Sequence, residues 1–139
     1  MTTPRSCLFL APAATPLNGI WPSVRVVEYD THSQQLLDMH VSHVNVTRAN
    51  SELAVTLEPF YSTRTAYSLP DMSPDSLRTL AATLLTSEDQ AVAYLRRQST
   101  SGSASGTSAC DESCRRNLYC TMSYTNTTLQ EQCKAASTR

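Results

Sequence analysis

The sequence predicts an α+β fold in which antiparallel strands come first and helices follow. Two observations predict it. Apolar and polar residues alternate in the N-terminal part, whereas after about Phe60 the apolar residues recur every three or four positions. The first spacing is typical of strands with one buried face, and the second of amphipathic helices. A chain of 139 residues is long enough for one modest hydrophobic core.

Four strands are expected, joined as an antiparallel meander with a turn at residues 30–33. The first is the apolar run Cys7 to Ala11, and the second is the β-branched run Val24 to Tyr29. The third and fourth show period-2 alternation, with these apolar positions: Leu37, Met39 and Val41, then Leu53, Val55 and Leu57. After Val41 the apolar phase slips, which predicts a bulge near Ser42 and His43.

Two helices are expected between residues 59 and 98. The first begins with Ser73 as N-cap and Pro74 at its first position. Its apolar stripe consists of Leu77, Leu80, Ala81 and Leu84. A capping box from Ser87 to Gln90 opens the second helix, which places Ala91, Tyr94 and Leu95 on its inner face.

Residues 99–109 are rich in serine and glycine, and predict a flexible linker. Two short helices are expected in the tail that follows, residues 110–139. One covers about Asp111 to Tyr119, and the other opens at Thr128 with Glu131 as its capping-box partner.

Composition excludes several classes of function. The formal net charge of −1 shows no basic footprint for nucleic acid, and no run of 18 apolar residues could span a bilayer. Three glycines are too few for a glycine-rich phosphate loop. The apolar stretch near the N-terminus is interrupted by Pro12, so a strand is expected there rather than a signal peptide.

Four of the five cysteines are close together near the C-terminus: Cys110, Cys114, Cys120 and Cys133. Such a cluster predicts either two disulfides or a zinc site. The disulfide pairs Cys110–Cys114 and Cys120–Cys133 are geometrically reasonable, because residues i and i+4 of a helix lie about 6 Å apart. Zinc sites usually set their thiolates in tighter pairs. Cys7 is expected as a buried free thiol.

Two sequons point to the same oxidising compartment as the disulfides. Asn45 and Asn126 each begin an N-x-[ST] triplet, and they are the expected glycosylation sites. Glycosylation and disulfides both belong to the secretory pathway. The chain is therefore expected to be secreted or lysosomal.

The cysteine-rich segment CDESCRRNLYC, with the following NTT and Cys133, resembles the C-terminal motif of acid sphingomyelinase and the acid sphingomyelinase-like phosphodiesterases. Further segments are similar to that family in the same order along nearly the whole chain. They are Leu10–Pro16 (LAPAATP), Arg25–Asp30 (RVVEYD), Asn45–Asn50 (NVTRAN) and Thr65–Leu69 (TAYSL).

The resemblance implies a parent enzyme that hydrolyses phosphodiesters, of the sphingomyelin or nucleotide type, with two zinc ions in a calcineurin-like β-sandwich. Residues 1–58 would be the last strands of that sandwich, and residues 59–98 and the disulfide-bonded tail would be its helical C-terminal subdomain. The family's metal motifs would then lie upstream of this chain. We therefore assign no catalytic residue, no metal ligand and no cofactor to it, and expect the upstream catalytic portion as its partner.

The histidines near the strands, together with Asp30, are candidate local metal ligands. Asp30 and His32 have the D-x-H form but lack the companion motifs of a dimetal site, so a turn is expected there. His40 and His43 are three positions apart, which puts them on opposite faces of a strand.

Two other classes of function stay open: a stand-alone secreted interaction module and a saposin-like lipid binder. A saposin-like protein needs six cysteines spread over its helices, whereas this chain clusters four at one end. A nucleophilic hydrolase is disfavoured because no G-x-S-x-G motif is present. Without a sandwich partner, the strands are expected to expose an apolar face with Leu37, Met39 and Val41, so that the isolated chain would aggregate.

Overall fold

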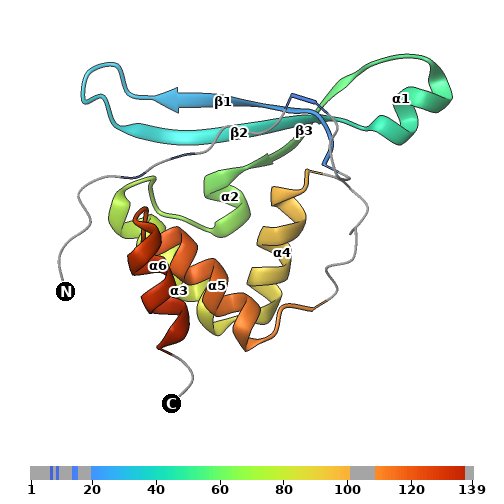
Figure 1. Ribbon diagram of the computed structural model, residues 1–139. Coiled ribbons are helices and arrows are strands. Elements are labelled where there is room, and N and C mark those ends of the chain that lie inside the picture. The colour runs from blue at the N-terminus through green and yellow to red at the C-terminus, as the bar shows by residue number, and fades with distance from the viewer. Residues whose placement is uncertain (1–6, 8, 10–13, 16–19, 101–108, 137–139) are drawn as a thin grey trace.

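The computed structural model describes residues 7, 9, 14–15, 20–100 and 109–136 of the chain. In this part, a three-stranded antiparallel sheet forms one layer, and helices pack beneath one of its faces (Figure 1). The α+β class predicted from the sequence is confirmed.

The sheet has the order β1-β2-β3 and consists of β1 (Ser23–Tyr29), β2 (Leu36–Val44) and β3 (Leu57–Ser62). β1 and β2 form the expected hairpin, and residues 31–33 lie in its turn. The expected strand Cys7 to Ala11 lies outside the described residues, apart from Cys7 and Phe9.

The predicted irregularity occurs close to its expected place. The pairing of β2 with β3 changes register between Val41, which faces Tyr61, and Ser42, which faces Pro59. Phe60 is therefore the extra residue, and the bulge belongs to β3. β2 itself pairs regularly with β1 from His43 to Asp38.

The predicted strand through Leu53, Val55 and Leu57 is wrong. The chain instead forms helix α1 (Val46–Glu52), which ends at Leu53 in a left-handed conformation with φ 53°. Asn45 starts this helix because its side chain accepts a hydrogen bond from the amide of Arg48. The apolar side chains of the alternating segment are not buried, since Leu53 is 93% exposed and Val55 is 79% exposed. Leu57 begins β3.

Five further helices follow the sheet: α2 (Thr63–Tyr67), α3 (Pro74–Thr86), α4 (Glu88–Gln98), α5 (Glu112–Ser123) and α6 (Thr127–Ala135). The predicted starts of α3 and α4 are confirmed, because the hydroxyls of Ser73 and Ser87 accept from the amides of Ser76 and Gln90. The short helix α2 was not predicted.

The two tail helices form, but their predicted boundaries need correction. α5 continues four residues beyond Tyr119, to Ser123, with Asp111 as its N-cap. α6 is capped by Asn126 rather than opened by Thr128, and Glu131 pairs with Lys134 at 2.9 Å instead of closing a capping box. Asparagine is a better N-cap than threonine, which explains the earlier start.

The core lies between the sheet and α3. Its buried residues are Met39, Leu69, Met72, Leu80 and Leu84. A second cluster joins α4 to the tail through Ala91, Val92 and Cys110. The apolar stripe predicted for α3 is therefore confirmed. The expected division at residues 58 and 59 falls inside β3, and most of the expected linker lies outside the described residues; the division into domains stays a prediction.

Candidate functional site

The four C-terminal cysteines form two disulfides, Cys110–Cys114 and Cys120–Cys133, the pairs expected from the sequence. Cys110 and Cys120 are completely buried. The second bond ties α6 to α5, and α5 packs along α3. A zinc site would need these sulfurs as free thiolates, so the disulfides exclude the zinc alternative for this cluster.

Arg115 fastens the first disulfide to the helical layer. Its guanidinium donates to the carbonyl oxygens of Leu85 (3.1 Å) and Cys110 (2.8 Å). The carboxylate of Glu88 accepts from the amide of Cys110 at 3.1 Å and lies 3.9 Å from the Arg115 guanidinium. These contacts hold the start of the tail against the corner between α3 and α4.

Asp30 and His32 belong to the turn that the sequence predicts. The carboxylate of Asp30 accepts from the amides of Ser33 (2.9 Å) and His32 (2.7 Å). These backbone hydrogen bonds lower the pKa of Asp30. The carboxylate is thus used as a turn cap.

His40 and His43 lie on opposite faces of β2, as expected. His40 is on the exposed face, where its Nε2 lies 3.1 Å from the carboxylate of Glu28. His43 is buried on the helix side, with its ring stacked 4.5 Å from Phe60 and edge-on to Trp21. No group of three His, Cys, Asp or Glu side chains that could hold a metal ion occurs in the described part of the chain. These residues therefore do not fit a dimetal centre.

Both sequon asparagines are helix N-caps. Oδ1 of Asn45 accepts from the amide of Arg48 at 2.9 Å, and Oδ1 of Asn126 accepts from the amide of Leu129 at 3.1 Å. A cap uses only the oxygen of the side-chain amide, so the nitrogen that would carry a glycan is not consumed by it. Asn126 is exposed and Asn45 is partly exposed.

Cys7 is a free cysteine, as expected, but it is exposed rather than buried. Burial was inferred from an apolar run of sequence, and such a run does not by itself cover each of its side chains.

Asp38 is a site that the sequence pattern missed. The apolar–polar alternation of the strand predicts that Asp38 faces solvent, yet its side chain is buried in the structure. Burial alone would raise the pKa of Asp38, but hydrogen bonds from the hydroxyl of Ser62 (2.5 Å) and the amides of Arg64 (3.0 Å) and Met39 (2.7 Å) outweigh it and lower the pKa. Asp38 thus fixes the junction of β3 and α2 to β2. The only sequence feature that pointed to this contact was Ser62, a residue type that favours the N-cap position of a helix.

A second missed feature is a cluster of tyrosines and one arginine between the sheet and α4. The Arg97 guanidinium lies 4.8 Å from the ring centroid of Tyr67 and 6.0 Å from that of Tyr61. Burial raises the pKa of Tyr61, Tyr67 and Tyr94, which keeps the phenols neutral. The cluster ties α4 to the sheet by cation–π contacts. The sequence feature that could have indicated this cluster is the three-residue spacing of Tyr94 and Arg97, which puts both side chains on one face of α4.

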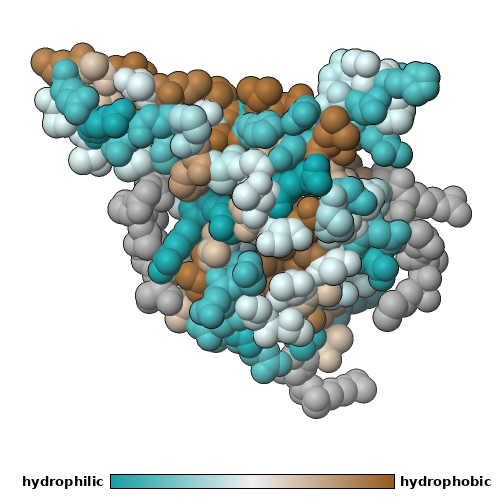
Figure 2. All heavy atoms as spheres, turned by 180° about the vertical axis from the view of Figure 1, so that it is seen from behind, coloured by the Kyte–Doolittle hydropathy of each residue, from teal (hydrophilic) through white to brown (hydrophobic). Residues whose placement is uncertain are grey.

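The face of the sheet that points away from the helices carries apolar side chains as well as Glu28, His40 and Ser42, and no described helix covers it. Because Met39 and Val41 are buried on the helix side, their strand neighbours His40 and Ser42 face outward, opposite Val26 and Val24 of β1. Val26 is 62% exposed. We call the apolar part of this surface the outer face, defined by Val24, Val26, Val44, Leu57 and Pro59. Figure 2 shows apolar atoms along the sheet and at the end that carries α1.

The outer face corrects one expectation. Leu37, Met39 and Val41 were expected on the exposed side, but Met39 and Val41 are buried beneath the helices, and Leu37 is 37% exposed. The helical layer buries this face of the sheet, which was expected to need the upstream sandwich for its burial. No helix in the described part of the chain has the length and apolar composition needed to cross a bilayer.

Comparison with known proteins places this architecture in a family. The family described as "Acid sphingomyelin phosphodiesterase C-terminal region" matches residues 3–138. An acid sphingomyelinase-like phosphodiesterase 3b of Homo sapiens is 30% identical over 143 aligned positions, covering 96% of this chain and 31% of the relative. A cyclic GMP-AMP phosphodiesterase of Mus musculus is 34% identical over 126, covering 84% and 27%.

A third relative, sphingomyelin phosphodiesterase A of Dictyostelium discoideum, is 25% identical over 119 positions, which cover 86% of this chain and 20% of the relative. The chain thus spans between a fifth and a third of the length of these relatives. The family match over almost all residues, together with the two disulfides in the helical layer, leads to one conclusion: this chain belongs to the acid sphingomyelinase and acid sphingomyelinase-like phosphodiesterase family, and corresponds to its C-terminal region.

Proposed function

We propose that this chain serves as a non-catalytic C-terminal region of a phosphodiesterase, and that the catalytic groups lie in the remainder of such an enzyme. The named relatives act on phosphodiesters of two kinds, sphingomyelin and cyclic GMP-AMP. The substrate class is therefore a phosphodiester. The two zinc ions of the parent family would be held by the remainder, because the described residues do not fit a dimetal centre.

The observation that carries the proposal is the outer face. Burying an apolar surface stabilises a protein by about 25 cal/mol per Å². A sheet with one face packed on helices and an exposed apolar patch on the other face is expected to have a second partner. The partner we propose is the upstream catalytic portion, whose sandwich the strands would complete.

The α1–β3 segment supports the same partner. Leu53 combines a left-handed backbone with almost complete exposure of a leucine side chain, and each feature costs free energy in an isolated chain. The segment continues the outer face through Leu57. Packing against the upstream catalytic portion would offset both costs.

The compartment we propose is the secretory pathway or the lysosome. Disulfides persist in oxidising compartments, and both sequons place their asparagines at exposed or partly exposed helix starts. Expression through a eukaryotic secretory pathway should add glycans that a glycosidase removes. Thr47→Ala and Thr128→Ala should each abolish one of them, as read by mass spectrometry, whereas unmodified asparagines in the secreted protein would contradict the glycosylation proposal.

A chimera tests the docking role. In it, the human relative keeps its upstream portion, and this chain replaces its own C-terminal region. We expect secretion and hydrolysis of bis-(p-nitrophenyl) phosphate, and loss of both when Val26→Lys places a charge on the outer face. Leu129→Lys is the matched control, because Leu129 is also exposed but lies on α6.

Two outcomes would overturn the proposal. One is full activity of the human relative without any C-terminal region. The other is an unchanged chimera carrying Val26→Lys, which would favour a stand-alone interaction module.

A further inference from the structure

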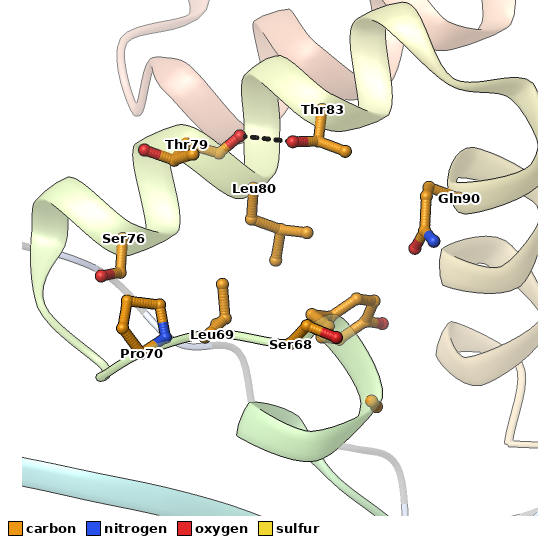
Figure 3. A pocket seen from close by; sticks show the side chains of 10 residues that line it. Ser68, Leu69, Pro70, Ser76, Thr79, Leu80, Thr83 and Gln90 are labelled. Carbon is orange, nitrogen blue, oxygen red and sulfur yellow. Dashed lines mark hydrogen bonds between the residues drawn. The ribbon is translucent and has the colours of Figure 1, made fainter.

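A pocket of about 350 Å³ lies between the segment that follows α2 and the helices α3 and α4 (Figure 3). Its volume is at the lower end of the range of small-molecule sites, about 300 to 1,000 Å³. It lies among the helices, whereas the outer face belongs to the sheet, so an inference about it does not depend on the proposed function.

The lining combines an apolar floor with a polar rim. Leu69 and Leu80 are buried and point toward one another, and Tyr67 adds a half-buried ring. Thr79, Thr83 and Gln90 lie at the exposed rim. Among the described residues, no charged side chain lines the pocket. A ligand that fits this lining is neutral, with one apolar side and several polar groups.

The rim is rich in acceptors. The hydroxyl of Thr79 donates to the carbonyl oxygen of Asp75, and that of Thr83 donates to the carbonyl oxygen of Thr79, each at 3.0 Å (Figure 3 marks the second). A hydroxyl has one proton and two lone pairs, so with these protons donated within the helix both oxygens offer lone pairs to a ligand. The Gln90 amide, across the pocket, offers both a donor and an acceptor.

An acceptor-rich neutral rim selects against anions. Phosphate and carboxylate oxygens carry lone pairs and would face the lone pairs of the threonine oxygens, with no cation in the lining to compensate. A ligand with several O–H donors and an apolar face matches both parts of the lining.

We propose that this pocket binds a neutral polyhydroxylated ligand, a monosaccharide or cyclic polyol, through O–H donors to Thr79 and Thr83 and an apolar face over Leu69 and Leu80. The open rim makes this a weak site, with dissociation constants on the order of millimolar, as for small ligands with few contacts.

Saturation-transfer NMR on the full chain tests the proposal, with glucose, mannose, galactose and myo-inositol as probes and inorganic phosphate as the contrasting anion in a titration. We expect saturation of at least one of the four hydroxylated probes. Thr83→Val and Thr79→Val keep the side-chain shape but remove an acceptor, and each should weaken binding about 5- to 10-fold, the loss expected for one hydrogen bond.

Thr86→Val is the matched control. Thr86 is on the same helix and donates to the carbonyl oxygens of Ala82 and Thr83, but it is outside the pocket lining. Binding should be unchanged in this variant, and its circular dichroism should match that of the two test variants. No saturation of any probe, equal binding by Thr83→Val and the wild type, or binding of phosphate in their place would each overturn the proposal.

Discussion

The Nδ1 of His43 lies 2.5 Å from the carbonyl oxygen of Thr100, and this contact joins strand β2 to the residue after the C-cap of helix α4, across 57 positions of sequence. A carbonyl oxygen can only accept, so Nδ1 carries the proton in this contact. Thr100 has φ 51°, an unfavourable backbone for a β-branched residue, and its hydroxyl donates to the carbonyl oxygen of Trp21 at 2.7 Å. These bonds hold the strained residue in place.

Replacing His43 by phenylalanine should destabilise the chain by about 1 to 3 kcal/mol. The ring stacking on Phe60 would be kept, but the buried carbonyl oxygen of Thr100 would lose its donor. Urea unfolding measures the loss. His40→Phe, on the exposed face of the same strand, is the control and should change the free energy of unfolding by less than about 0.5 kcal/mol. Equal effects of the two substitutions would contradict the role of His43.

Asp38→Asn should lower the free energy of unfolding by about 1 kcal/mol at neutral pH, since charge-assisted hydrogen bonds weaken. The pKa of Asp38 is lower in the folded than in the unfolded chain. Its contribution is therefore present above the unfolded pKa, about 3.9, and is lost as pH falls through the folded pKa. The difference between wild type and variant should stay constant from neutral pH to about pH 5 and shrink below about pH 4. A constant difference in urea unfolding down to pH 2 would contradict this assignment.

Removing the Cys120–Cys133 disulfide with the double substitution Cys120→Ala and Cys133→Ala should cost roughly 3 kcal/mol, and removing Cys110–Cys114 roughly 2 kcal/mol, by loop entropy. Loss of Cys120–Cys133 should also lower the protection of the α6 amides against hydrogen exchange, because α6 packs mainly against α5. Hydrogen exchange read by mass spectrometry reports this directly. Unchanged protection of α6 after loss of the bond would show that packing alone holds the helix.

The isolated chain should self-associate through the outer face. Val26→Lys should raise the concentration at which light scattering first appears, because a charge opposes both apolar contact and edge pairing. Val41→Lys puts the same charge on the buried face of the sheet and should unfold the chain instead. Scattering that is unchanged by Val26→Lys would mean that another surface drives association.

Elements with local signals were predictable from the sequence. Ser73 followed by Pro74 marked the start of α3, and the cysteine spacing gave both disulfide pairs. The prediction of a strand through Leu53 failed because alternation indicates a strand only where one face is buried, whereas the side chains of Leu53 and Val55 are exposed. The cap at Asn45 decided that segment in favour of a helix.

The sites that depend on long-range contacts could not be predicted. Asp38 looks like a surface residue until β3 and α2 bring Ser62 and Arg64 to it. Likewise, the exposed side of the sheet was misassigned because the sequence shows which residues share a face, but not which face the helices cover. Figure 1 shows the described helices beneath the sheet, on the side opposite the outer face.

The most direct test of the central claim measures the zinc content of the purified chain and its zinc-dependent hydrolysis of bis-(p-nitrophenyl) phosphate in the same sample. We expect less than stoichiometric zinc and no turnover, since catalysis is assigned to the remainder of the enzyme. Stoichiometric zinc together with turnover that Asp30→Ala or His32→Ala abolishes would contradict it, and would make the turn at residues 30–33 part of an active site.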